Sequence, residues 1–392
     1  MELSPRFEVG WGVRRKLQFL GRVPLLVFAL AGVTAWAPAQ NTPLAKLKLN
    51  TGAEIYQAAC VACHGPDGKG MPDTTVAFDK PKTFPDFTQC DQTTPELNKD
   101  WKATVRDGGA GRGFSRIMPA FGEALNSKQL DQVVQYLRGF CTDKIWPRGE
   151  FNLPLPQFTE KAFPENEVII TSRLNAQRTP GVTNDIISEN TFGARNQLEV
   201  DVPVNFNRSA PGLWYGGVGD ATVGLKHVVF ANLHTGSILS GFGGIILPSG
   251  STSHGLGTGT TQFETFAAFA QLLPSESFVQ LQAGTDQPSD TSKAPRSVFW
   301  RSAFGKTFRQ SNGVGRMWTP MVELVVNKDF LPHTTPDWDI VPQFQVSLSQ
   351  RQHVRINLGT SSPVSNTSNR PIQVVFYVLW DWFDGSILKG WK

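Results

Sequence analysis

The sequence has little charge for its length. Of its 392 residues, 18% are charged, against about 25% in an average soluble domain. Sparse charge excludes a long coiled coil, and 11% aromatic residues exclude a disordered chain. The net charge is only +4, and residues 1–39 carry five basic against two acidic side chains. The rest of the chain therefore lacks the broad basic surface of a nucleic-acid-binding protein, and we expect no nucleic-acid partner.

Long apolar runs are also scarce. The run at residues 23–37 is shorter than the ~20 residues of a spanning helix, and no later segment has 18 consecutive apolar residues. Three basic residues, Arg14-Arg15-Lys16, precede this run, and Ala37-Pro38-Ala39 ends it. This order predicts a cleaved signal peptide at residues 1–39, with a membrane anchor as the alternative.

Cysteine is rare, and two of the four cysteines stand in one motif. Cys60-Val61-Ala62-Cys63-His64 has the Cys-x-x-Cys-His spacing of c-type heme attachment. It predicts one covalent heme c, with thioethers at Cys60 and Cys63 and His64 as the proximal iron ligand. A zinc half-site, the first alternative, needs two more ligands of comparable spacing. A redox dithiol, the second alternative, has no need of the histidine.

Histidine is scarce near this motif, which narrows the choice of a distal ligand. No histidine except His64 precedes His227, so the candidates are Met71 and Met118. Met71 follows His64 too closely to reach the opposite heme face easily. Met118 precedes Pro119, which favours an extended loop, so we predict Met118 as the distal ligand, with an ordinary core methionine as the alternative. His/Met ligation leaves no open iron position and suits one-electron transfer.

Helical patterns surround the motif. Residues 51–54 form a capping box, and residues 95–106 and 126–140 have apolar positions at helical spacing. With the heme motif and Met118-Pro119, this stretch of residues 45–145 resembles class I cytochrome c domains. The resemblance implies an all-α fold in which the first and last helices cross beside a mostly buried heme.

The other two cysteines are Cys90 and Cys141. Export favours a disulfide between them, which would close the terminal helix onto the middle loop. Two separate buried thiols are the alternative.

The pattern changes after a segment rich in proline. Residues 146–165 hold four prolines and are predicted to be a stiff linker. In residues 166–392 apolar and polar residues alternate with period two, as in the stretch 343–348. Because the polar face is rich in Gln, Asn, Ser and Thr, this predicts an antiparallel transmembrane β-barrel of about 12 strands around a wet lumen. A soluble sandwich is the alternative.

Tryptophans near predicted strand ends suit the interfacial girdles of such a barrel. They are Trp214, Trp300, Trp318, Trp338, Trp380 and Trp382.

Four segments of the β region resemble outer-membrane channel proteins that are often described as phenol-degradation-pathway transporters. These segments are residues 316–323, 338–345, 352–359 and 377–385. The order of the two regions is similar to that of cytochrome–porin fusions that oxidise extracellular iron. These resemblances imply the outer membrane of a Gram-negative-type cell, with the cytochrome domain periplasmic or at the barrel mouth.

The expected function is one-electron transfer by a heme tethered to the barrel. The expected partners are a periplasmic or extracellular redox partner and outer-membrane lipid. The sequence has no triad, carboxylate-pair or phosphate-loop pattern, so we expect an electron carrier rather than an enzyme with its own substrate site. A channel for small solutes with an auxiliary cytochrome is the alternative, and a soluble exported oxidoreductase subunit is the third. The sequence indicates no oligomeric state.

Overall fold

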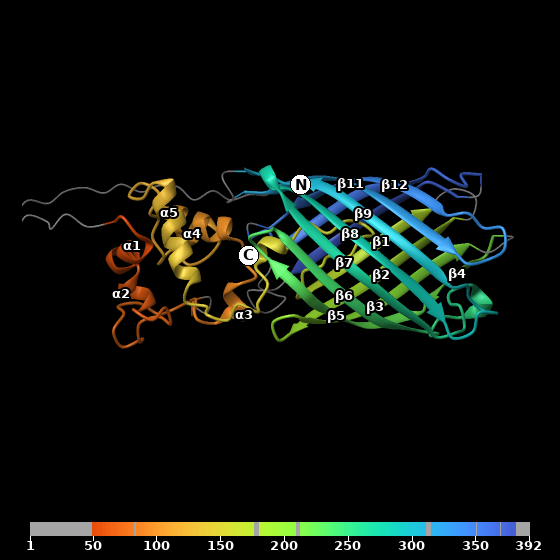
Figure 1. Ribbon diagram of the computed structural model, residues 1–392, viewed down its shortest axis with the longest axis horizontal. Coiled ribbons are helices and arrows are strands. Elements are labelled where there is room, and N and C mark those ends of the chain that lie inside the picture. Colours follow the sequence, from red (N-terminus) through yellow and green to blue (C-terminus); the bar gives the residue numbers. More distant parts are fainter. Residues whose placement is uncertain are drawn as a thin grey trace, which may run out of the picture. The chain divides into compact units, whose positions relative to one another are not determined.

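The chain is helical in its first part and β-stranded in its second (Figure 1). The computed structural model describes residues 49–81, 84–175, 180–208, 212–310, 315–349, 351–368 and 370–381. The predicted signal peptide at residues 1–39 lies outside the described residues, as does Trp382. No helix within the described ranges is long and apolar enough to cross a membrane.

Five α-helices and one 3-10 turn make up the first part. They are α1 (Gly52–Ala59), α2 (Val61–His64), α3 (Cys90–Thr93), α4 (Asn98–Gly111), α5 (Ser127–Arg138) and η1 (Gly149–Phe151). The predicted capping box begins α1, where the backbone N–H of Glu54 donates to Oγ1 of Thr51 at 3.2 Å. Helices α1 and α5 pack together and share a buried core that includes Ile55, Val133 and Leu137. The predicted all-α cytochrome region is confirmed.

The second part is a closed antiparallel sheet. Its twelve wall strands are β1 (Glu167–Asn175), β2 (Gly181–Phe192), β3 (Asn196–Arg208), β5 (Ala221–Asn232), β6 (Ser237–Leu247), β7 (Gln262–Leu273), β8 (Ser277–Pro288), β9 (Ser297–Lys306), β11 (Met317–Asp329), β12 (Asp337–Ser347), β13 (Val354–Pro363) and β14 (Gln373–Asp381). The short strands β4 (Trp214–Val218) and β10 (Phe308–Arg309) pair with the ends of β3 and β11. Because β1 pairs with β14 and β9 with β11, the sheet closes, which confirms the barrel and excludes the sandwich.

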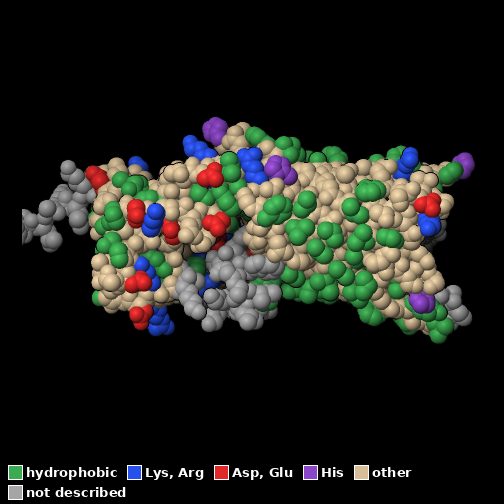
Figure 2. All heavy atoms as spheres, turned by 90° about the horizontal axis from the view of Figure 1, so that it is seen from below, with side chains coloured by type: hydrophobic (Ala, Val, Ile, Leu, Met, Phe, Trp, Pro, Cys, Tyr) green, Lys and Arg blue, Asp and Glu red, His purple; other side chains and the backbone are tan. Residues whose placement is uncertain are grey.

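Alternation places the two kinds of side chain on opposite faces of the wall. On β12, Val341, Gln343 and Gln345 are buried inside, whereas Ile340 and Phe344 are about 40% exposed on the outer face. Figure 2 shows hydrophobic side chains spread over the strands, with few charges among them. The period-two pattern therefore predicted the two faces correctly.

The barrel interior holds part of the proline-rich segment. Residues 151–165, here called the inner segment, hydrogen-bond to inward-facing side chains of the wall. The carbonyl oxygen of Leu155, for example, accepts from the Tyr377 hydroxyl at 2.5 Å and from Nδ2 of Asn357 at 3.3 Å. The sequence predicted a linker at residues 146–165; most of it lies in the lumen.

Candidate heme-binding site

The heme motif spans the junction of α1 and α2. Cys60 ends α1, and α2 carries the rest of the motif as one tight turn. The backbone N–H groups of Cys63 and His64 both donate to the Cys60 carbonyl oxygen, at 3.1 and 2.9 Å. Neither Cys60 nor Cys63 is in a disulfide, so both sulfurs are available for thioether bonds.

The four predicted site residues line one cavity. Cys60, Cys63, His64 and Met118 all border a cavity of about 820 Å³, in the size range of cofactor sites. Met71 is not among the described residues that line it. The structure therefore brings Met118 to the motif from 54 positions further along the chain.

The walls of this cavity are mainly apolar. They include Phe84, Phe87, Trp101, Val105, Phe121 and Leu137. The His64 ring stacks on Phe84, with 5.0 Å between ring centroids, and lies 4.9 Å from Phe87. Such walls suit a large flat apolar group and exclude water from it.

His64 has the protonation state that metal binding needs. Its side chain is 9% exposed, and its Nδ1 has no hydrogen-bond partner among the described residues. Burial lowers the pKa of His64 to about 4, so the imidazole is neutral near pH 7. A neutral imidazole has a free lone pair for iron, and the residues of this cavity fit a c-type heme.

Two glycines of α4 hold the loop that carries Met118. The backbone N–H of Gly109 donates to the Met118 carbonyl oxygen at 3.0 Å. A Cβ on Gly109 would meet the Ser115 carbonyl oxygen at 2.2 Å, and Gly108 has a φ of +75°. Only glycine allows this close approach. No sequence pattern predicts this role, although the adjacent pair Gly108-Gly109 is visible in the sequence.

A buried ion pair also borders the cavity. Arg112 and Asp100 are 2% and 5% exposed, and the Arg112 guanidinium lies 3.2 Å from an Asp100 carboxylate oxygen. From the sequence, Arg112 is one of several basic residues near the motif or the Met118 loop that could meet heme propionates or an acidic partner, with ordinary solvated charge as the alternative. A buried guanidinium at this place suits the carboxylates of a heme.

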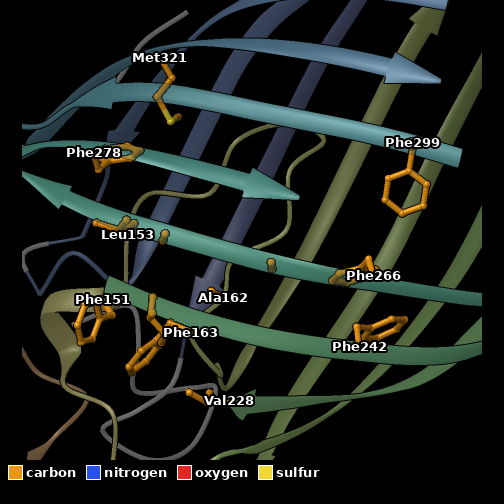
Figure 3. Packing of buried hydrophobic residues seen from close by; sticks show 13 residues of the cluster. Phe151, Leu153, Ala162, Phe163, Val228, Phe242, Phe266, Phe278, Phe299 and Met321 are labelled. Carbon is orange, nitrogen blue, oxygen red and sulfur yellow. The ribbon is translucent and has the colours of Figure 1, made fainter. Parts of the chain in front are cut away.

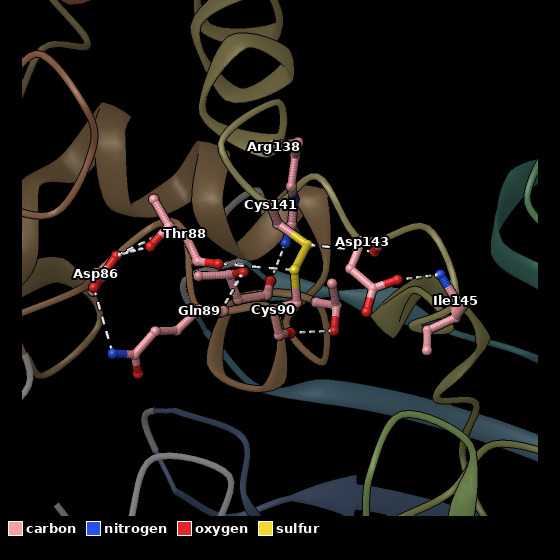
Figure 4. The surroundings of a disulfide bond; sticks show 10 residues. Asp86, Thr88, Gln89, Cys90, Arg138, Cys141, Asp143 and Ile145 are labelled. Atoms are coloured by element: carbon pink, nitrogen blue, oxygen red, sulfur yellow. Dashed lines mark hydrogen bonds between the residues drawn. A yellow bond between two sulfur atoms is a disulfide. The ribbon is translucent and has the colours of Figure 1, made fainter.

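The remaining cysteines form the disulfide that export favours (Figure 4). Cys90 at the start of α3 is joined to Cys141, beyond the end of α5, with Cα atoms 5.2 Å apart. In the same region, Oδ1 of Asp143 accepts from the backbone N–H of Ile145 at 3.0 Å. The bond links the terminal helix to the middle loop, as predicted.

Comparison with known protein families gives a match for the first part of the chain. Residues 48–137 match the family described as cytochrome C oxidase, cbb3-type, subunit III. No curated protein matches the chain.

Three solved structures are similar to the chain at low identity. An outer membrane channel from Pseudomonas putida F1 is 13% identical, over 59% of this chain and 100% of its own, with a TM-score of 0.41. The KdgM porin in complex with disordered oligogalacturonate is 11% identical, over 55% and 99%, with a TM-score of 0.38. The NanC porin is 9% identical, over 55% and 98%, with a TM-score of 0.36.

The family match agrees with the motif, the cavity and the helical fold. Residues 48–137 are a cytochrome c domain of the cbb3-type subunit III kind, joined in one chain to a closed twelve-stranded β-barrel.

Proposed function

We propose that the chain is an electron carrier with one covalent heme c, anchored in the outer membrane by its barrel. Cys60 and Cys63 form the thioethers, His64 is the proximal ligand and Met118 the distal ligand. The observation that carries the proposal is the single cavity that these four residues line. Heme bound there supplies one-electron oxidation and reduction.

The side chains of the cavity fit this task. The neutral His64 imidazole offers its nitrogen from one side, and the Met118 thioether is the soft ligand that raises a heme reduction potential. With His64 and Met118 both bound to iron, no ligand position would be left for a substrate, which would favour electron transfer over chemistry on a bound substrate. The apolar walls keep water away, and the buried Arg112 offers positive charge to the heme carboxylates.

The outer face of the barrel supports a membrane location. Many large apolar side chains there are exposed, among them Leu198, Val223, Leu225, Phe263, Phe304 and Leu358. Soluble proteins rarely expose contiguous apolar areas above a few hundred Å² (about 300–600 Å²), whereas a membrane barrel needs an apolar outer band. Trp300, Trp318 and Trp338 are 38–46% exposed, as girdle residues would be. These features favour lipid over the soluble alternative.

The chain between the two domains supports a cytochrome domain held at the barrel mouth. The backbone N–H of Gly149 donates to the Thr94 carbonyl oxygen at 2.7 Å, and Oε1 of Glu150 accepts from the Asn98 N–H at 3.1 Å. The next residue, Phe151, already packs in the barrel's buried cluster. Phe151 ends η1 and already lies among residues of the barrel, so no flexible linker separates the two domains. The heme would therefore meet its periplasmic or extracellular redox partner beside the barrel.

Heme staining and optical spectra of the purified full chain test the carrier role. After denaturing electrophoresis, heme should remain on the protein and be lost in the Cys60→Ala/Cys63→Ala variant. The optical spectrum should change reversibly on one-electron reduction. Absence of covalent heme from protein made in a host with a heme-attachment system contradicts the proposal.

Intact cells test whether electrons reach the outside. A polymer-bound reductant too large to pass porins should reduce the heme in intact cells. If reduction occurs only after the cells are permeabilised, the extracellular route is wrong and the redox partner is periplasmic.

A further inference from the structure

The barrel takes part in the candidate heme site. The cavity that Cys60 and Met118 line is also bordered by Gly193 and Ala194, in the turn between β2 and β3. Phe163 of the inner segment borders the cavity as well, and it packs within the buried cluster of the barrel (Figure 3). The cavity therefore has walls from both domains.

One barrel residue contacts the loop of the distal ligand directly. Arg351 lies in the turn between β12 and β13 and is 8% exposed. Its guanidinium donates to the Gly113 carbonyl oxygen at 2.9 Å and lies over the Phe114 ring, 4.2 Å from the ring centroid. The planar guanidinium of an arginine suits both contacts.

We propose that Arg351 is a positioning residue of the heme site: it holds the loop that carries Met118, so that the barrel stabilises the bond between Met118 and iron. The inference deepens the proposed function and rests on it, because it takes Met118 as the distal ligand.

The contact reaches Met118 through two backbone hydrogen bonds. The N–H of Phe114 donates to the Gly109 carbonyl oxygen at 2.8 Å, and the N–H of Gly109 donates to the Met118 carbonyl oxygen at 3.0 Å. Gly109 therefore connects the residue that Arg351 holds to the residue that carries the thioether. A shift of Phe114 would be passed on to Met118.

The turn that carries Arg351 has an unusual backbone conformation. Gln352, the next residue, has a φ of +69°, which residues with a Cβ seldom adopt. Nε2 of Gln352 donates to the Gly315 carbonyl oxygen at 2.7 Å, and Oε1 accepts from the Arg309 guanidinium at 3.4 Å. Such a conformation persists only where the surrounding structure imposes it. These bonds therefore fix the turn and give Arg351 a defined position.

Ion pairs hold the neighbouring helix against the barrel. Arg309 of β10 lies 3.7 Å from a carboxylate oxygen of Asp100 in α4. The Arg309 Nε also donates to the Glu276 carboxylate at 2.7 Å, and Glu276 pairs with Lys99 of α4. Because α4 ends directly before the loop, these ion pairs keep the loop within reach of Arg351.

Loss of Arg351 should therefore loosen the loop. A hydrogen bond from a charged donor corresponds to roughly a tenfold or larger change in an equilibrium constant. The fraction of molecules in which Met118 is away from iron should rise by that factor. Added imidazole, a ligand for iron, binds only those molecules, so its apparent dissociation constant falls as the fraction rises.

Imidazole titration of the oxidised full chain in detergent tests the inference, with optical spectra as the readout. Arg351→Ala should bind imidazole roughly tenfold more tightly than the wild type. Arg351→Lys keeps a charged donor but loses the planar stacking, so its affinity should lie between the two.

The matched control is Arg370→Ala. Arg370 lies between β13 and β14, at the opposite end of β13 from Arg351, and pairs with Asp339. This variant should bind imidazole like the wild type. Heat-modifiable migration in gels reports whether the barrel of each variant is folded.

The outcomes separate this inference from the proposed function. Wild-type imidazole affinity in Arg351→Ala overturns the inference and leaves ligation by Met118 standing. A wild-type protein without the methionine-to-iron charge-transfer band overturns both. Equal tightening in Arg370→Ala assigns the effect to a general loosening of the barrel and also overturns the inference.

A change in the cytochrome domain provides the test if Arg351→Ala does not fold. Phe114→Leu removes the ring beneath the guanidinium, leaves every barrel residue in place, and should also tighten imidazole binding. Arg351→Lys should have a smaller effect in the Phe114→Leu background than in the wild type, because both changes remove the same stacking contact. Equal effects of Arg351→Lys in the two backgrounds overturn the inference.

Discussion

Thr159 in the inner segment and Glu323 on β11 share a short hydrogen bond, with 2.6 Å between the threonine Oγ1 and the glutamate Oε1. Each residue is 1% exposed. The Glu323 carboxylate also accepts from the backbone N–H of Phe158 and from Nε2 of Gln343. A buried carboxylate needs such partners, and here the segment supplies most of them. The inner segment thus supplies the hydrogen-bond donors that this buried carboxylate of the wall needs.

Replacement of Glu323 should loosen the segment. Glu323→Ala leaves the donors of Thr159 and Phe158 buried without an acceptor, at about 1–3 kcal/mol for each unsatisfied group. The expected result is a lower melting temperature of the barrel in detergent, measured by circular dichroism. Glu323→Gln keeps one acceptor oxygen and should lose less stability. Equal stability of the wild type and Glu323→Ala would contradict the binding of the inner segment to Glu323.

Lys161 forms buried ion pairs with Glu165 and Glu167. Removing the lysine alone should therefore destabilise the protein more than removing all three charges. Lys161→Met leaves the carboxylates of Glu165 and Glu167 buried and uncompensated, which should cost about 3–5 kcal/mol. Adding Glu165→Gln and Glu167→Gln removes the uncompensated charge, so the triple variant should regain much of that loss. Urea unfolding of the three proteins in detergent gives the comparison. A triple variant less stable than Lys161→Met shows that the pairing does not govern stability here.

The residues that line the candidate site could be chosen from the sequence where the pattern is local. The heme motif spans five residues, and Met118 was predicted as a ligand because so few His and Met residues lie nearby. The buried ion pair of Arg112 with Asp100 was not predicted, because the two residues stand 12 positions apart, a spacing that gives no motif.

The strands of the barrel wall could be predicted from the sequence, but the position of the inner segment in the lumen could not. Period two assigns each wall residue to a face whatever its neighbours are. The inner segment looks like any proline-rich linker, since Phe158 and Thr159 meet Glu323 across about 165 positions. Only the closed wall brings that carboxylate to them.

The disulfide should stabilise the cytochrome domain. Cys90 and Cys141 are 51 positions apart, and closing a loop of that length corresponds to about 4 kcal/mol in the chain-entropy description. Cys90→Ala/Cys141→Ala should therefore lower the temperature at which the heme absorption of the folded domain is lost. With the heme kept fully reduced in every sample, a thiol reductant should lower it in the wild type and leave the variant unchanged. An effect of the reductant on both proteins to the same extent assigns the loss to another cause.

Ligation by Met118, as proposed, would have a spectroscopic signature that separates it from a packing role. Met118→Ala should abolish the methionine-to-iron charge-transfer band of the oxidised protein and lower the reduction potential, because thioether ligation favours reduced iron. Met71→Ala, a methionine of the same domain that does not line the cavity, should leave both unchanged. Thioether bonds at Cys60 and Cys63 would be independent of this ligand, so both variants should still stain for covalent heme. A band that survives Met118→Ala and disappears in Met71→Ala moves the assignment to Met71. Because Gly109 binds the Met118 carbonyl oxygen and admits no Cβ, Gly109→Ala should weaken the same band while Met118 is still present.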